Sequence, residues 1–400
     1  MAAGSRHPKT IVYSGCSVME TRPIRWWGWG YIDVTYPLED RPFFWKFLRD
    51  GLQVEPQEVL PVPPMEGISL PPVRLKPQML DELAHIVGEK HVSIAHSERL
   101  SHTLGKSYPD LIRLRLNQVK RAPDAVVFPG SEEEIRTLME FAIRRKVALI
   151  PFGGGTTVVG GVEAVTPEGF AGSVCVDMRR LNRLLALDKH SGTATFEAGI
   201  RGPELEAILN KEGFTLGHFP QSFEFSSLGG WIATRSAGQK STGYGKIEDM
   251  VLSLRVCTPQ GLIETRTVPA SASGPSLKEI LIGSEGVYGI ITQATMRVHP
   301  LPEAMEHWGV LFPGFEEGIK ALREMLQEGF SPATLRLSDE GETGAYWAMR
   351  RVHRGWKGKR DRIVSWYLEK KGYFPGGSLL ILGVEGSREE VERMRRGCLD

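Results

Sequence analysis

The chain has 400 residues, of which 41% are hydrophobic and 24% are charged, as is usual for a globular protein of two or three domains. Its formal net charge of +1 gives no general reason to expect nucleic-acid binding. No run of residues is apolar enough for a signal peptide or a membrane span, so we expect neither. The cysteines form no C-x-x-C motif, which predicts no metal site and a reducing, cytoplasmic environment.

The N-terminal third of the chain has little regular pattern. The Trp-rich segment at 25–31 is interpreted as packing for a small N-terminal unit, with the wall of an apolar substrate site as the alternative. Residues 56–77 are rich in proline and predict an extended connector. The histidines that follow lack the spacing of a helical ligand pair, so we expect surface or capping roles for His91, His96 and His102.

A regular α/β pattern begins near residue 121. A strand is predicted at 124–128, and Ser131 with Glu134 forms a capping-box signal before a helix whose apolar residues share one face. The next strand, 147–150, completes a β-α-β unit. Further strands are predicted at 173–177, 193–197, 251–257, 262–265 and 290–298, and further helices at 202–213 and 277–282.

The β-α-β unit leads directly into a glycine-rich loop at 151–157, which contains three consecutive glycines. Without Cβ atoms this backbone can adopt positive φ and approach a ligand closely, and its free N–H groups suit a phosphate. The Lys-Ser/Thr of a P-loop is absent, and so is the G-x-G-x-x-G of a Rossmann fold. A mobile loop without a ligand is the alternative interpretation.

Two further glycine-rich segments occur at 217–238 and 283–289. Three such segments in one α+β domain favour a ligand that has a pyrophosphate and two ends, and FAD is a ligand of this kind.

The pattern changes again beyond residue 302. A helix is predicted at 315–327, strands at 333–337 and 379–384, and a second helix from residue 388. Residues 350–362 contain seven Lys or Arg residues around Trp356. This basic run predicts either a solvated mobile loop or contact with an anionic membrane surface.

Several of these segments resemble a known family. The runs PFGGGTT, GHFPQSFEFSSLGGWIATRSAG and GSEGVYGIIT resemble the FAD-binding domain of the vanillyl-alcohol oxidase and p-cresol methylhydroxylase (PCMH) superfamily. The WGWG and SPATLRL runs resemble its alkyl-dihydroxyacetonephosphate synthase family. The resemblance covers roughly residues 25–400.

The resemblance implies an α+β fold with three regions. These are a Trp-rich and helical N-terminal region at 1–117, a PCMH-type FAD-binding domain of two α/β subdomains at 118–302, and a partial α+β cap or substrate domain at 303–400. The family's acid/base tyrosine and its histidine run are expected beyond Asp400.

The resemblance also implies a function. The family exchanges the acyl group of acyl-dihydroxyacetone phosphate for a long-chain alcohol in ether-lipid synthesis, through an adduct at the flavin N5 atom. An FAD-linked oxidase or dehydrogenase of a 2-hydroxy acid or an alcohol is the alternative, and a flavin-binding protein without catalysis is the second alternative. A lipid phosphate and a long-chain alcohol are the expected small-molecule partners; peripheral contact with a membrane and a homodimer are left open.

Two catalytic residues are implied. Arg336 matches an active-site arginine that could pair with the substrate phosphate or with a reduced flavin, and a strand-edge salt bridge is the alternative. His218 matches a histidine near the flavin, and a hydrogen-bonded turn histidine is the alternative. The first glycine loop has Thr156 where covalent relatives often have histidine nearby, so we expect noncovalent FAD.

The cofactor-binding residues that the resemblance implies come from the three glycine-rich segments. They are Pro151, Phe152, Gly153, Gly154, Gly155, Thr156, Thr157, Gln221, Ser222, Phe223, Glu224, Phe225, Ser226, Ser227, Thr234, Arg235, Ser236, Ala237, Glu285, Gly286, Val287, Tyr288, Gly289, Ile290 and Ile291.

Overall fold

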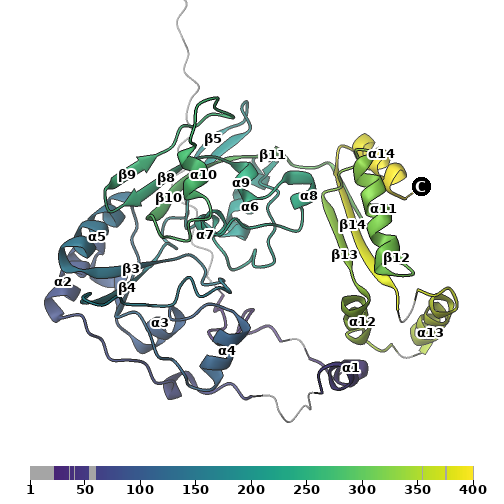
Figure 1. Ribbon diagram of the computed structural model, residues 1–400, viewed down its shortest axis with the longest axis horizontal. Coiled ribbons are helices and arrows are strands. Elements are labelled where there is room, and N and C mark those ends of the chain that lie inside the picture. Colours follow the sequence, from purple (N-terminus) through teal and green to yellow (C-terminus); the bar gives the residue numbers. More distant parts are fainter. Residues whose placement is uncertain are drawn as a thin grey trace, which may run out of the picture. The chain divides into compact units, whose positions relative to one another are not determined.

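The computed structural model describes residues 22–399 apart from residues 36, 40, 54–59, 354, 374 and 375. The described chain divides into two compact units (Figure 1). Unit 1 takes its residues from Met1–Ile32, Val62–Gly238 and Gly245–Pro300. Unit 2 takes its residues from Asp33–Pro61, Gln239–Tyr244 and Leu301–Asp400.

The first sheet of unit 1 has four strands in the order β1-β2-β4-β3. Strands β2 and β3 run parallel to β4, and β1 pairs antiparallel with β2. Helices α2 and α5 bury apolar side chains such as Leu83 and Phe141 against this sheet. The bounds are β1 Val92–Ser93, β2 Ala125–Val127, β3 Val147–Phe152, β4 Gly172–Asp177, α2 Pro77–Val87 and α5 Glu132–Arg145.

Helix α5 begins as its sequence predicts. The Ser131 hydroxyl accepts a hydrogen bond from the Glu134 N–H at 3.1 Å, and the Glu134 carboxylate accepts one from the Gly130 N–H at 2.7 Å. The glutamate thus reaches one residue further back than in a standard capping box. The helix buries one face, including Ile135 and Leu138, and so connects β2 to β3 across the sheet.

The second sheet of unit 1 has five antiparallel strands in the order β5-β6-β10-β8-β9. Its edge strand β5 is short and mostly half-buried, and it was not predicted although its first four residues are apolar. A two-stranded pair, β7 with β11, lies outside this sheet. The bounds are β5 Leu184–Asp188, β6 Thr193–Glu197, β7 Phe214–Thr215, β8 Val251–Thr258, β9 Gly261–Glu264, β10 Ile290–Arg297 and β11 His299–Pro300.

Short helices connect these strands. The helix predicted at 202–213 is present as α6, and the one predicted at 277–282 is present as α10. The bounds are α6 Gly202–Lys211, α7 Leu228–Ala233, α9 Ile247–Met250 and α10 Leu277–Leu281.

The N-terminal part of unit 1 has its own small apolar cluster. Trp26 of the Trp-rich segment packs against buried residues that include Leu100 and Leu114. A β-bridge between Ile24 and Tyr31 closes the Trp-rich segment on itself. The helical elements here are η2 Met65–Gly67, η3 Glu89–His91, α3 His96–Ser101 and α4 Tyr108–Arg115.

Unit 2 is built on an antiparallel sheet with the strand order β12-β14-β13. Helices α11 and α14 pack on this sheet, and Met325, Leu380 and Leu382 lie at the centre of the core (Figure 1). The bounds are β12 Ala304–Phe312, β13 Thr334–Ser338, β14 Ser378–Gly386, α1 Pro42–Leu52, α11 Phe315–Gln327, α12 Glu340–Ala348, α13 Gly355–Lys370 and α14 Arg388–Leu399.

The interpretation of residues 350–362 as a mobile loop is wrong for much of the run, because α13 begins at Gly355. Lys, Arg, Trp and Leu are compatible with a helix, and no proline interrupts the segment. None of the described residues of α13 is buried. Its apolar residues are also not gathered on one face, so the sequence lacks the periodicity by which a helix is usually recognised.

A short segment of unit 2, Gln239–Tyr244, comes from the middle of unit 1 along the chain. It includes the one-turn helix α8, Ser241–Tyr244. The Lys240 ammonium lies 2.6 Å from the Glu385 carboxylate, and the Ser331 hydroxyl donates to the Thr242 carbonyl at 3.0 Å. Gly243 packs so closely on unit 2 that an added Cβ would lie 2.9 Å from the Ala333 Cα.

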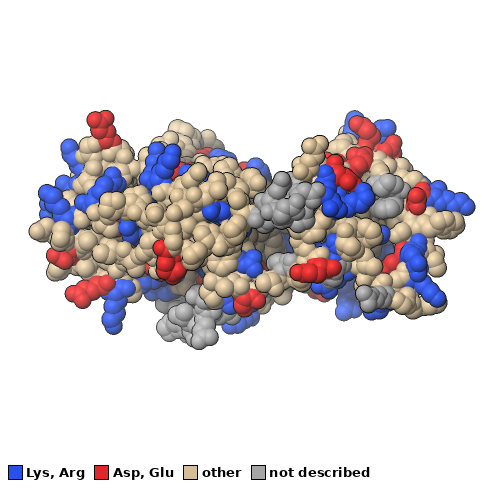
Figure 2. Space-filling view, turned by 90° about the horizontal axis from the view of Figure 1, so that it is seen from below, with Lys and Arg blue, Asp and Glu red and all other residues tan. Residues whose placement is uncertain are grey.

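Among the helices of the described chain, none is both long enough and apolar enough to cross a membrane. Figure 2 shows acidic and basic side chains interspersed on the face it displays, without one extended field of a single sign.

Candidate cofactor-binding site

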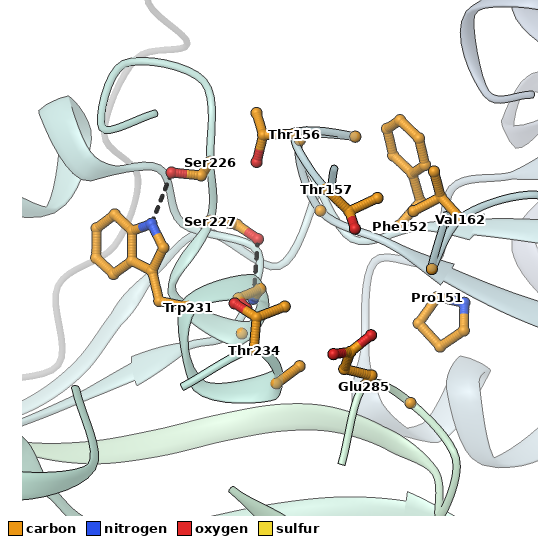
Figure 3. Close-up of a pocket in the computed structure, with 18 of the residues that line it drawn as sticks. Pro151, Phe152, Thr156, Thr157, Val162, Ser226, Ser227, Trp231, Thr234 and Glu285 are labelled. Atoms are coloured by element: carbon orange, nitrogen blue, oxygen red, sulfur yellow. Dashed lines mark hydrogen bonds between the residues drawn. The ribbon is translucent and has the colours of Figure 1, made fainter. Parts of the chain in front are cut away.

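Unit 1 contains a cavity of about 380 Å³, within the usual range for a small-molecule site (Figure 3). Most of its walls come from three stretches that are distant in sequence and that carry the glycine-rich segments, and Met178 and Ala198 complete them. The lining residues are Pro151, Phe152, Gly153, Gly154, Gly155, Thr156, Thr157, Val158, Val159, Gly161, Val162, Met178, Ala198, Ser222, Ser226, Ser227, Gly229, Gly230, Trp231, Ala233, Thr234, Ser236, Glu285, Gly286, Gly289, Ile290 and Ile291.

The first glycine loop packs directly against the second glycine-rich segment. A Cβ added to Gly153 would lie 2.1 Å from the Ser227 hydroxyl oxygen, and one added to Gly154 would lie 1.8 Å from the Phe225 carbonyl oxygen. Gly155 has a φ of +64°, in the left-handed region that favours glycine. Gly153 and Gly154 therefore let the two loops touch, and a Cβ at Gly155 would instead lie 2.4 Å from the Phe152 ring.

The cavity wall offers hydroxyl groups in two different states. Ser226 is fully engaged, because it accepts from the Trp231 indole N–H at 2.6 Å and donates to the Ser222 carbonyl at 2.8 Å (Figure 3). Ser227 accepts from the Gly230 N–H at 3.4 Å, and Thr157 accepts from the Val159 N–H at 3.3 Å. Because Ser227 and Thr157 act as acceptors in these bonds, their own hydrogens can be donated to a ligand.

Among the described residues that line the cavity there is no Lys, Arg or His, and Glu285 is the one carboxylate. An anionic ligand would therefore be held by backbone N–H groups and hydroxyls rather than by cationic side chains. This neutral donor set fits a pyrophosphate embedded in a larger ligand, and it fits the FAD that the sequence predicts.

The third glycine-rich segment is fixed to its neighbours through the backbone. The Glu285 N–H donates to the Ala233 carbonyl at 2.9 Å, and Glu285 has a φ of +48°, which is uncommon for a residue other than glycine. At Gly289 an added Cβ would lie 2.2 Å from the Cys257 carbonyl oxygen. The strained conformation at Glu285 places a carboxylate at the cavity, a combination typical of functional sites.

His218 is buried, with 1% of its surface exposed, and it does not line the cavity. Its Nε2 atom lies 3.2 Å from the hydroxyl of Ser236, which does line it. The imidazole also makes an edge contact with Trp231 at 5.0 Å between ring centroids. Burial lowers the pKa of His218 to about 4, although Glu248 acts in the opposite direction. The side chain is therefore neutral near pH 7.

This buried histidine should make unit 1 sensitive to acid. The unfolded chain has the ordinary His pKa of 6.5 and takes up a proton below it, whereas the folded His218 stays neutral down to about pH 4. The contribution of His218 to the free energy of unfolding is therefore fully present above pH 6.5. It decreases as the pH falls towards 4, by about 3 kcal/mol in total. Urea unfolding at pH 7 and pH 4.5 should show a larger loss in the wild type than in His218→Gln. An equal loss in both would contradict this assignment.

Some predicted cofactor residues do not line the cavity. Phe225 contacts the aromatic rings of Trp29 and Tyr31, which joins the Trp-rich segment to the second glycine segment within unit 1. Arg235 lies near Glu248, and Val287 is largely exposed. The predicted residues outside the lining are Gln221, Phe223, Glu224, Phe225, Arg235, Ala237, Val287 and Tyr288.

Other lining residues were missing from the prediction. Trp231 and its neighbours in α7 carry no polar signal of ligand binding, although their glycines could have suggested it. Met178 and Ala198 follow the ends of β4 and β6, so they become visible only once the strands are placed in their sheets. The residues not foreseen are Val158, Val159, Gly161, Val162, Met178, Ala198, Gly229, Gly230, Trp231 and Ala233.

His102 does not lie at the surface, but the expected capping role is correct, because the residue ends α3 and its Nδ1 atom lies 2.7 Å from the Glu98 carbonyl oxygen. It is 2% exposed, and its Nε2 atom lies 2.9 Å from the carboxylate of Asp177, which also accepts from Arg179 at 2.7 Å. Burial alone would raise the pKa of Asp177, but the hydrogen bonds from His102 and Arg179 lower it. The centroid of the His102 ring lies 4.5 Å from that of Phe152, so the buried cluster of His102, Asp177 and Arg179 packs against the start of the first glycine loop.

Arg336 lies in unit 2, on strand β13. Its guanidinium forms an ion pair with the Glu342 carboxylate of α12 at 2.5 Å. The side chain is 34% exposed, so a ligand could still reach it.

The comparisons agree with this geometry. The family described as "FAD binding domain" matches residues 123–266, and the family described as "FAD linked oxidases, C-terminal domain" matches residues 301–398. The fold and its cavity thus define a flavoprotein of the FAD-linked oxidase class.

The chain is 40% identical over 338 residues to an alkyldihydroxyacetonephosphate synthase of Dictyostelium discoideum, covering 84% of this chain and 55% of the relative. It is 35% identical over 398 residues to one of Trypanosoma brucei brucei, covering 93% and 64%. A solved alkyldihydroxyacetonephosphate synthase matches with a TM-score of 0.82 at 37% identity, covering 94% of this chain and 72% of that one.

The chain belongs to the alkyldihydroxyacetonephosphate synthase family. It spans between about half and two thirds of the length of the curated relatives named above. The predicted family, the α+β fold class and FAD as the cofactor are therefore confirmed.

Proposed function

We propose that this chain contributes to an FAD-dependent transferase that exchanges the acyl group of an acyl-dihydroxyacetone phosphate for a long-chain alcohol. The observation that carries the proposal is sequence identity of 35–40% to alkyldihydroxyacetonephosphate synthases over 84% and 93% of the chain. FAD-linked oxidation of a 2-hydroxy acid or an alcohol, and flavin binding without catalysis, are the other candidates that the experiment below separates.

The cavity of unit 1 is the proposed FAD site. The backbone N–H groups around Gly153–Gly155, with the hydroxyls of Thr156, Thr157 and Ser227, would hold the pyrophosphate. Bound flavin would supply the ring on which the chemistry takes place. The protein's share is to fix the position of that ring, to exclude water and to bind the substrate. Because no His or Cys of the described residues lines the cavity, the FAD is proposed to be noncovalent.

The deciding experiment is an anaerobic incubation of the purified protein, expressed from its complete reading frame, with palmitoyl-dihydroxyacetone phosphate and hexadecanol. Formation of the alkyl product supports the transferase. Bleaching of the flavin by D-lactate or glycolate, without alkyl product, would support the oxidoreductase instead. Absence of both responses in a protein that holds FAD would support flavin binding without catalysis.

Arg336 is proposed to bind the substrate phosphate. Its fork of donors can bind two oxygens at once, whereas a lysine presents a single charged point. We expect Arg336→Lys to retain full FAD content while its kcat/KM for the acyl substrate falls on the order of tenfold. Glu342→Gln is the matched control, since it removes the arginine's ion-pair partner but keeps the arginine. Wild-type kinetics for Arg336→Lys would exclude the role.

Unit 2 is also proposed to touch a membrane that holds the lipid substrates. Helix α13 exposes 82% of Trp356, which lies within the basic run, and 59% of Trp366, which follows the run along the same helix. Tryptophan and basic side chains are the residues that favour the surface of an anionic bilayer.

We expect the protein to co-sediment more strongly with vesicles that contain phosphatidylserine than with neutral phosphatidylcholine vesicles. Each basic residue near the surface contributes about 1 kcal/mol, so high salt should remove most of the difference. The variant Trp356→Ala should weaken binding to both vesicle types. Equal sedimentation with anionic and neutral vesicles would rule out the electrostatic contact.

A further inference from the structure

The hydroxyl of Ser236 differs from the other hydroxyls of the cavity in having a buried imidazole as its partner. Ser236 is held firmly by its backbone, because its N–H donates to the Trp231 carbonyl at 3.0 Å and its own carbonyl accepts from the Ile247 N–H at 3.1 Å. Its hydroxyl oxygen lies 3.2 Å from His218 Nε2. The direction of this hydrogen bond decides what Ser236 can offer to a ligand.

The surroundings of His218 fix that direction. A neutral imidazole carries one N–H and one bare nitrogen, so only one of its two nitrogens can donate. The Nδ1 atom is buried and has no hydrogen-bond partner among the described residues. It lies against Gly238, where an added Cβ would come within 3.3 Å.

A buried N–H without an acceptor is rarer in proteins than an acceptor without a donor. The proton of His218 therefore belongs on Nε2, and it is donated to the Ser236 oxygen. The Ser236 hydrogen then points away from His218. Since Ser236 lines the cavity, that hydrogen is available to a ligand inside it.

We propose that Ser236 donates a hydrogen bond to the bound flavin cofactor, and that His218 is the positioning residue that holds the Ser236 hydroxyl in the donating orientation. This inference rests on the proposed FAD site in the cavity of unit 1. It changes the role implied for His218, which acts through Ser236 and does not itself touch the cofactor. Ser226, whose hydrogen goes to the Ser222 carbonyl, cannot offer the same bond.

The test measures FAD binding to apoprotein by titration, together with the visible spectrum of the bound flavin. Ser236→Ala removes the donor and should raise the Kd for FAD about tenfold. His218→Phe keeps an aromatic ring beside Trp231 but removes the Nε2 donor, and it should raise the Kd by a similar factor. His218→Gln keeps an N–H near the position of Nε2 and should restore most of the affinity. The absorption maxima of bound flavin should shift together in Ser236→Ala and His218→Phe.

The double variant distinguishes positioning from a purely structural role. If His218 acts through Ser236, His218→Phe adds nothing to the Kd in the Ser236→Ala background. A full additional effect there would overturn the proposal, and so would wild-type affinity and spectrum in Ser236→Ala. If His218→Phe does not fold, Ser236→Ala and His218→Gln still decide the question.

Failure of the underlying site is recognised separately with Gly154→Asp, which disrupts the first glycine loop of the same cavity. If that variant still binds FAD normally, the cofactor lies elsewhere and both proposals fall. If it loses FAD while Ser236→Ala binds like the wild type, only the assignment of Ser236 and His218 falls.

Discussion

Gly154→Asp is expected to abolish FAD binding. The new Cβ would lie 1.8 Å from the Phe225 carbonyl oxygen and 2.8 Å from its carbonyl carbon, so the first and second glycine segments would have to separate. The aspartate would also place a negative charge beside the proposed pyrophosphate. At ~4–6 Å and an effective dielectric constant of about 20, each pair of like charges costs about 3–4 kcal/mol. Flavin content, read as the ratio of absorbance at the flavin and protein bands, should fall to the background level.

The matched control is Gly28→Asp, which adds the same charge to unit 1. No atom lies within 4 Å of a Cβ built at Gly28, and its φ does not require glycine. This variant should bind FAD like the wild type. Circular dichroism of both apoproteins would show whether Gly154→Asp remains folded. Unchanged flavin content in Gly154→Asp would mean that this loop does not hold the phosphates.

Lys240→Met is expected to destabilise unit 2 by about 3–5 kcal/mol, because it leaves the Glu385 carboxylate buried without its cation. The two side chains of this pair are only 16% and 4% exposed, and one Glu385 oxygen already lacks a hydrogen-bond partner among the described residues. The variant should unfold at a lower urea concentration. Replacing both partners, in Lys240→Met with Glu385→Leu, should recover most of the loss, since an apolar pair needs no charge compensation.

An exposed pair in the same unit provides the control. Lys46 and Asp50 of α1 are 69% and 62% exposed, and solvent screens such a pair strongly. Lys46→Met should therefore change the free energy of unfolding by less than about 1 kcal/mol. If Lys240→Met were no more costly than Lys46→Met, the buried pair would not stabilise unit 2.

Features that depend on neighbouring residues were predictable from the sequence. The Ser131 cap, the β-α-β unit, the strand at 193–197 and the helix at 315–327 rest on local periodicity and turn chemistry, and the structure confirms them. The three glycine-rich segments were recognisable for the same reason. Glycine runs are visible in one dimension, and the structure shows that all three line one cavity.

Features that depend on distant partners were not predictable. His102 has no local signal of burial, because its partner Asp177 lies 75 positions away on another element. The glycines at 153 and 154 were expected to make room for a ligand, but the atoms nearest to them belong to Ser227 and Phe225. The burial of His218 was not predictable either, because it depends on Trp231, Ser236 and Gly238 packing around the imidazole in the folded chain.

The assignment of Gln239–Tyr244 to unit 2, between two segments of unit 1, has a consequence for the production of separate domains. A fragment that ends at Pro300 would carry this hexapeptide without the strands that receive it, and it would expose Lys240 to solvent. A fragment that begins at Leu301 would lack the hexapeptide, so Glu385 would lose its counter-ion. The segments of the two units alternate along the chain, so a single cut releases neither unit intact. A protease that nicks the chain after Pro300 should accordingly leave both pieces bound together until denaturant is added.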